Sequence, residues 1–232
     1  MIELNNKSKK LLLLQRNELL SDRQKWLRRK FGRYMFTNLF VNFNQHKNIE
    51  KIAFDLFNKE LDTFRDFLPN LANNIMDIGC GLAIIDIKLN KFYKNNPNFY
   101  LLDKDKIDSK ITYGFSSNYE SYSDLQETKN ILLHNNIREE NIHLYNVEKK
   151  IEIKKKIDLV ISLKSLGYHY PFEKYLDLFK KCCTKNTVFI FDVSEGCFDY
   201  ALFKKYFQNI DIIYEEDSIH TLKRLCCKNF KL

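Results

Sequence analysis

The first seventy residues carry apolar side chains at helical spacings. Two sets of residues show the pattern: Leu13, Leu20, Leu27 and Tyr34, and then Ile49, Ile52, Ala53, Leu56 and Phe57. Intervals of three, four and seven residues place side chains on one face of a helix. Strand-like alternation of apolar and polar positions does not interrupt them, and Pro69 closes the region. We therefore expect residues 1–70 to form a helical N-terminal extension or cap.

After residue 70 the pattern changes to short β-rich runs that alternate with helical stretches. Predicted strands span residues 75–78, 99–102, 142–146, 159–163, 188–193, 211–215 and 221–227, and predicted helices span 83–93, 123–135, 171–183 and 198–207. This alternation is typical of a parallel sheet with crossover helices. The last two strands are joined by about five residues, too few for a parallel crossover, so they should pair antiparallel. Residues 71–232 are therefore expected to form an α/β domain whose sheet ends in an antiparallel hairpin.

The composition indicates a folded chain, and the charge distinguishes its N-terminal stretch. Hydrophobic residues make up 44% of the 232 residues and aromatic residues 14%, which is too much apolar surface for a disordered chain. The net charge is +8. Ten basic and two acidic residues lie between Lys7 and Arg33, so this stretch carries the whole excess. Any long-range attraction to a polyanion therefore belongs to the N-terminal stretch.

Two further features bear on the compartment and on metals. The apolar run Leu11–Leu14 is too short for a signal peptide or a membrane span. We therefore expect no membrane span, a cytoplasmic location and reduced thiols at the six cysteines. Cys182 and Cys183, like Cys226 and Cys227, are adjacent pairs without the Cys-x2-Cys spacing of zinc sites, so we expect no metal site.

The clearest chemical motif is a pair of glycines at the end of the predicted strand 75–78. Only six glycines occur in the chain, and two of them stand in Asp77-Ile78-Gly79-Cys80-Gly81. Because Gly79 and Gly81 have no Cβ, the backbone can turn sharply from a strand into a helix and approach a ligand closely. Asp77 adds a carboxylate beside this turn.

A second acid stands about twenty residues later, where the predicted strand 99–102 is followed by Asp103. A carboxylate at this position can bind the ribose hydroxyls of an adenosine-type ligand. The glycine pair could also form a plain tight turn, but the acids beside both strand ends favour a nucleoside site. A dinucleotide site needs Gly-x-Gly-x-x-Gly, and here Ile84 stands at the third glycine and Asp86 follows. A pyrophosphate therefore fits this turn poorly.

The form Asp-x-Gly-x-Gly resembles motif I of class I S-adenosylmethionine-dependent methyltransferases, and the terminal antiparallel hairpin also resembles that fold. The resemblance covers about residues 70–230, with Ala83 in place of the third small residue of the motif. It implies an α/β, Rossmann-like, seven-stranded sheet, S-adenosylmethionine as the cofactor and methyl transfer as the activity.

The resemblance also implies roles for individual residues. Four residues of the turn would line the cofactor: Asp77, Gly79, Cys80 and Gly81. Asp103 would bind the ribose of the cofactor. Asn146 and Val147, at the end of the predicted strand 142–146, would flank its adenine.

In this fold the end of the fourth strand faces the transferable methyl group, and here that region carries Lys164 and His169. Methyl transfer from a sulfonium depends mainly on alignment of donor and acceptor, and a base only removes a proton. His169 is the best candidate base because imidazole titrates near neutral pH, although it could instead pack against or cap the next helix. Lys164 could bind an acidic substrate, act as a base if desolvated, or simply be solvated. Tyr168, Tyr170 and Glu195 are further pocket candidates.

Three interpretations of the acceptor and the basic stretch stay open. Residues 165–171 resemble the loop of small-molecule and glycan O-methyltransferases, and they lack the Pro-Pro and Pro-Cys motifs of DNA methyltransferases. Residues 7–34 could instead bind RNA, with Arg and Lys on phosphates and Trp26 or Tyr34 stacked on bases. A non-catalytic subunit with this fold is the third possibility. The sequence favours a small-molecule or glycan hydroxyl as the acceptor.

Overall fold

The computed structural model describes residues 2–43, 48–107, 122–166, 171–194, 199–216 and 222–231. Seven of the described strands form one sheet: β1 (Asn74–Ile78), β2 (Asn98–Asp103), β5 (Ile142–Asn146), β6 (Leu159–Ser162), β7 (Val188–Ser194), β8 (Phe207–Glu216) and β9 (Leu222–Phe230). The spatial order is β5-β2-β1-β6-β7-β9-β8. The first five strands of this order are parallel, and β9 is antiparallel to both β7 and β8. The predicted seven-stranded α/β sheet with its antiparallel hairpin is confirmed.

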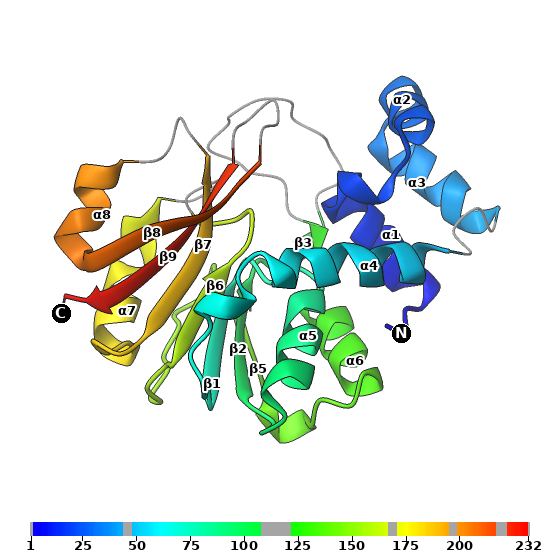
Figure 1. The fold of residues 1–232 in the computed structure, drawn as a ribbon. Helices are drawn as coiled ribbons and strands as arrows, with labels where there is room; N and C mark the ends of the chain where they lie inside the picture. The colour runs from blue at the N-terminus through cyan, green and yellow to red at the C-terminus, as the bar shows by residue number, and fades with distance from the viewer. Residues whose placement is uncertain are drawn as a thin grey trace.

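Helices cover both faces of the sheet, as the fully buried strands require. Figure 1 shows α4 (Ile49–Asp62), α5 (Ile84–Tyr93) and α6 (Leu125–His134) on one side, and α7 (Leu176–Cys182) and α8 (Tyr200–Tyr206) on the other. Each side has its own cluster of buried apolar side chains. Along β1 the side chains alternate between them, so Ile75 belongs to the α5 side and Met76 to the α7 side.

The sheet reverses its direction of growth at β1. From β1 the chain passes to β2 on one side, and it later returns to place β6 on the other. The carboxyl ends of parallel strands at such a switch point leave a crevice in which ligands of open α/β sheets bind. The end of β1 is followed by the glycine pair, so the topology brings that turn to the crevice.

The N-terminal extension is helical, as the sequence predicted. It contains α1 (Asn6–Gln15), the 3-10 turn Asn17–Leu19, α2 (Asp22–Phe31) and α3 (Arg33–Asn42), which lie beside α4 in Figure 1. Ser21 and Gln24 form a reciprocal capping box that starts α2. Gly32, at φ 84°, separates α2 from α3.

The extension does not have a core of its own. The run Leu11–Leu14 is buried, and Leu12 and Leu13 belong to the same apolar cluster as Ile75 and Ile161 of the sheet. The helix face of α4 that carries Ala53 joins this cluster too. The change from helical to β-rich texture near residue 70 therefore marks a change of element along the chain, while a single cluster of packed side chains spans both parts.

Most element boundaries follow the predicted ones, and four regions differ. The last strand, β9, ends at Phe230 rather than at residue 227. The predicted helix 171–183 begins as a 3-10 turn, Phe172–Tyr175, before α7. The strand expected at 211–215 starts at Phe207, because Phe207 is buried and pairs with Phe230 across the hairpin. Between β2 and α6 lie two short antiparallel strands that were not predicted, β3 (Lys106–Ile107) and β4 (Tyr122–Ser123). Within the described ranges, each helix is too short or too polar to cross a membrane.

Candidate functional site

The turn between β1 and α5 favours glycine at both of its glycine positions. Gly79 has φ +75° and Gly81 φ +55°, a backbone conformation that strains other residues. A Cβ on Gly79 would lie 2.3 Å from the Cβ of Ser165, and one on Gly81 would lie 2.8 Å from Oε1 of Gln15. The N–H of Gly79 donates to the carbonyl of Leu102 at 2.7 Å, which ties the turn to the end of β2.

Asp103 fixes the second half of this turn. Its two carboxylate oxygens accept from the backbone N–H groups of Gly81 and Lys104, each at 2.7 Å. Burial raises the pKa of Asp103 to about 6, and the two backbone hydrogen bonds oppose that rise. Asp103 is therefore a carboxylate held at the end of β2, directly beside the glycine turn.

The next strand end lies against Asp103. Asn146, the last residue of β5, pairs with Asp103 in the register of the parallel strands. The N–H of Val147 donates to the Asp103 carbonyl at 3.0 Å, and Asn146 Oδ1 accepts from the N–H of Glu148 at 2.9 Å. The structure thus brings together the two predicted groups, the glycine turn with Asp103 and the pair Asn146 and Val147, across three neighbouring strands.

A second carboxyl lies beneath the turn, and sequence reasoning missed its contact. Asp86, in the first turn of α5, is fully buried and lies beside Asp77 of β1. Burial, followed by the charge of Asp86, raises the pKa of Asp77 well above its usual range. Burial raises the pKa of Asp86 to about 7. The available signal was an acid at an otherwise apolar helix position, nine residues after Asp77.

Lys164 stands just beyond the end of β6 and is bound to the N-terminal extension. Its backbone has φ 61°, and its N–H donates to Asp192 Oδ2 at 3.1 Å. Its ammonium group forms an ion pair with Glu18 of the 3-10 turn after α1. His169, Tyr168, Tyr170 and Glu195 lie outside the described residues. Of the predicted catalytic pair, the structure therefore describes Lys164 but not His169.

A buried network of charges joins the N-terminal extension to strands β7 and β9 of the sheet. Arg224 of β9 makes two hydrogen bonds to its cross-strand neighbour Asp192, at 2.7 and 2.9 Å. Arg16 holds the Glu60 carboxylate at 3.3 and 3.2 Å, and Arg224 reaches the same carboxylate at 3.5 Å. The sequence carried no signal for this network, because its members are far apart along the chain.

Many of the basic side chains of the N-terminal stretch have partners within the chain. Six of the ten are held by carboxylates, carbonyls or a tyrosine hydroxyl: Lys7, Lys9, Arg16, Lys25, Arg28 and Arg33. Arg28 is buried and donates to the carbonyls of Leu13 and Leu14 at the end of α1, at 2.8 and 3.5 Å. The formal charge of this stretch therefore overstates what it offers to a polyanion.

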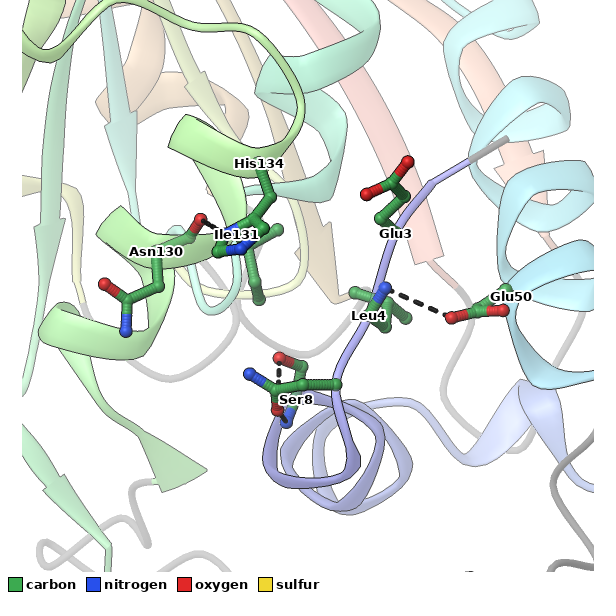
Figure 2. A pocket seen from close by; sticks show the side chains of 8 residues that line it. Glu3, Leu4, Ser8, Glu50, Asn130, Ile131 and His134 are labelled. Atoms are coloured by element: carbon green, nitrogen blue, oxygen red, sulfur yellow. Dashed lines mark hydrogen bonds between the residues drawn. The ribbon is translucent and has the colours of Figure 1, made fainter.

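A separate cavity of about 260 Å³ lies between residues 3–8, α4 and α6. Figure 2 shows Leu4 with its N–H directed at Glu50, and Asn130 and His134 on α6 across the cavity. The Leu4 N–H donates to Glu50 Oε1 at 3.1 Å, and His134 Nδ1 lies 2.7 Å from the Asn130 carbonyl. The residues predicted for the functional site do not line this cavity. The cavity lies where residues 3–8 pack beside α4 and α6.

Comparisons with known proteins identify the fold. The sequence matches no family model and no curated protein. The O-methyltransferase segment of StiE (residues 961–1257) superposes with a TM-score of 0.54 and 12% identity, over 83% of this chain and 81% of that one. A candidate O-methyltransferase from Nostoc punctiforme superposes with a TM-score of 0.52 and 9% identity, over 76% of this chain and 56% of that one.

Coclaurine N-methyltransferase bound to N-methylheliamine and S-adenosylhomocysteine gives a TM-score of 0.43 and 11% identity, over 63% of this chain and 36% of that one. The chain thus spans about a third of that protein and just over half of the Nostoc protein. The superpositions with StiE and with the Nostoc protein have TM-scores above 0.5 and cover 83% and 76% of this chain. The chain therefore has the fold of the class I S-adenosylmethionine-dependent methyltransferases.

Proposed function

We propose that the chain is an S-adenosylmethionine-dependent methyltransferase. The observation that carries this proposal is the site at the switch point, where a turn with two glycines at positive φ lies beside Asp103 and, one strand further, Asn146. A turn without side chains lets a ligand lie against the backbone, and the acid at the second strand end suits ribose hydroxyls. The residues present therefore fit an adenosine ligand with a short polar tail.

Each residue has a separate task in this proposal. Asp103 binds the ribose hydroxyls, and Asn146 with Val147 flanks the adenine. Gly79, Cys80 and Gly81 form the floor under the methionine portion, and Asp77 faces its ammonium group. When bound, S-adenosylmethionine supplies an electrophilic methyl group, and the protein aligns it with the acceptor.

We further propose that the acceptor is a hydroxyl of a small molecule or glycan. Support comes from residues 165–171, which resemble the loop of such enzymes, and from the internal partners of Lys7, Lys9, Arg16 and Arg28, which leave fewer cations for RNA phosphates. His169 removes the hydroxyl proton in this proposal. Lys164 is not the base in this proposal, because its ammonium group is already paired with Glu18.

Thermal unfolding with S-adenosylhomocysteine tests the cofactor assignment. A ligand that binds only the folded chain raises the melting temperature, by an amount that grows with its concentration. Asp103→Ala should abolish the rise, whereas Glu140→Ala, a matched change at an exposed carboxylate, should leave it intact. An unchanged melting temperature of the natural chain at saturating ligand would refute the methyltransferase assignment.

An acceptor screen tests the second part of the proposal. Sugar and nucleotide hydroxyls are incubated with the chain and labelled S-adenosylmethionine, followed by RNA. His169→Ala should lower kcat with little change in the KM of the acceptor, because a base acts on the reacting proton rather than on binding. Label transfer to RNA, together with no transfer to any sugar or nucleotide hydroxyl, would replace the small-molecule acceptor by RNA.

A further inference from the structure

Two carboxyl groups, Asp77 and Asp86, lie side by side beneath the glycine turn. Asp77 is 3% exposed and Asp86 is 0% exposed. Within the described residues, both side-chain oxygens of Asp86 lack a hydrogen-bond donor, and Asp77 is its neighbour. Buried carboxylates ordinarily have donors or counter-ions, so the unsatisfied Asp86 carboxyl beside Asp77 calls for a ligand or a proton.

The charged groups around the pair do not neutralise it. Asp103, from the end of β2, adds negative charge to the surroundings of Asp77. Arg16 is the favourable charge acting on Asp77, yet its guanidinium already makes two hydrogen bonds to Glu60. The Cys80 thiol also faces these acids, and burial followed by their charge raises its pKa well above the usual value, so it stays protonated.

We propose that Asp86 is the second carboxyl of a site for the ammonium group of the cofactor, and that the Asp77–Asp86 pair gives up a proton when that ammonium binds. The proposal rests on the proposed function and extends it to a residue outside the glycine motif. In the step, an O–H bond of the pair breaks, its proton passes to the solvent, and the charge that remains is balanced by the incoming ammonium.

The pH dependence follows from the protonation of the free pair. Burial raises the pKa of Asp77 well above its usual range and that of Asp86 to about 7, so the free pair holds its protons below neutral pH. The ammonium binds the form that has lost a proton. Affinity for a ligand with an ammonium group should therefore rise about tenfold per pH unit below pH 7 and level off above it.

Calorimetric proton counting tests the proposal on the unmodified chain. S-Adenosylhomocysteine and 5′-methylthioadenosine are titrated at pH 6.0, 6.5 and 8.0 in buffers of different ionisation enthalpy. Both ligands carry the adenosine, so any contribution of Asp103 is common to them, whereas only the first carries the ammonium. We expect S-adenosylhomocysteine to release about one proton more than methylthioadenosine at pH 6.0, and the difference to vanish at pH 8.0.

The outcomes separate this inference from the proposed function. Absence of binding by both ligands at every pH would overturn the methyltransferase assignment itself. Binding of both with equal proton release would leave that assignment in place and overturn the role of the pair.

The variant Asp86→Asn tests whether Asp86 supplies the released proton. Asp86→Asn keeps the shape and removes the titrating group, so the difference in proton release should disappear while methylthioadenosine binds as before. Asp66→Asn, a matched change at an exposed carboxylate, should retain the full difference. An undiminished difference in folded Asp86→Asn would show that another group supplies the proton.

Discussion

At the scale of single residues, the two glycines of the β1–α5 turn are under different constraints. A Cβ on Gly79 meets the Cβ of Ser165, which is fixed close to its backbone, whereas one on Gly81 meets only the flexible end of Gln15. Gly32 provides a reference, because its φ is also positive but no atom lies within 4 Å of its added Cβ. Comparison of the three positions therefore separates backbone strain from collision.

We predict that Gly79→Ala destabilises the chain more than Gly32→Ala. Strain at positive φ costs about 1–2 kcal/mol in both, and the collision with Ser165 adds to it at Gly79 only. The free energies of unfolding in urea measure the difference, and Ser165→Gly in the Gly79→Ala background should recover part of it. Equal losses at Gly79 and Gly32 would contradict the packing described for the turn.

Asp86 leads to a prediction for stability that is independent of any ligand. Its pKa of about 7 in the folded chain lies above its ordinary value, so the folded state binds more protons than the unfolded state between about pH 4 and pH 7. Stability therefore falls as pH rises through this window. Asp86→Asn should raise the free energy of unfolding at pH 8 by on the order of 2–4 kcal/mol, and by less at pH 5. A gain that is equal at both pH values would contradict the raised pKa.

At the scale of elements, local patterns were enough to predict the strands and the glycine turn. Apolar runs bounded by turn residues are short-range features, and the glycines act through their own backbone. The early start of β8 at Phe207 depends on a partner, Phe230, that is more than twenty residues away. Cys226 and Cys227 are both buried because β9 lies between β7 and β8. Cys226 belongs to the apolar cluster on one face of the sheet and Cys227 to the cluster on the other. Contacts between residues far apart along the chain, such as these, cannot be predicted from the local sequence pattern.

The basic run on α2 shows the same limit for charge. Arg28, Arg29 and Lys30 are equivalent in the sequence, yet Arg28 is buried against the last carbonyls of α1 and the other two are exposed. Hydrogen bonds to a charged group contribute about 1.5–3 kcal/mol, so their loss is measurable.

Arg28→Ala should therefore lower the free energy of unfolding by about 2–3 kcal/mol, whereas Arg29→Ala should change it by less than about 0.5 kcal/mol. The free energies of unfolding of the two variants, measured by chemical denaturation, test this prediction. A test of RNA binding is better made with Arg23→Glu and Arg29→Glu than by deleting residues 1–34, because the deletion removes the buried Leu11–Leu14 from the common core.

At the scale of the whole molecule, the network of Arg16, Glu60, Arg224 and Asp192 joins elements from both ends of the chain. Removal of one partner from a buried ion pair leaves an uncompensated charge, which costs about 3–5 kcal/mol. Arg224→Leu should therefore destabilise the chain by this amount, with little dependence on salt because the network is buried. A loss below about 1 kcal/mol in equilibrium denaturation would show that the network is not coupled to folding.

The same network has a consequence for the order in which the chain becomes structured during synthesis. Arg16 leaves the ribosome well before Arg224 and the strand β9 that inserts between β7 and β8. Until then the two edges that β9 fills stay open, and Glu60 has only one of its two cationic partners. Nascent chains that end before β9 should therefore present unpaired strand edges and depend on chaperones until β9 has been synthesised.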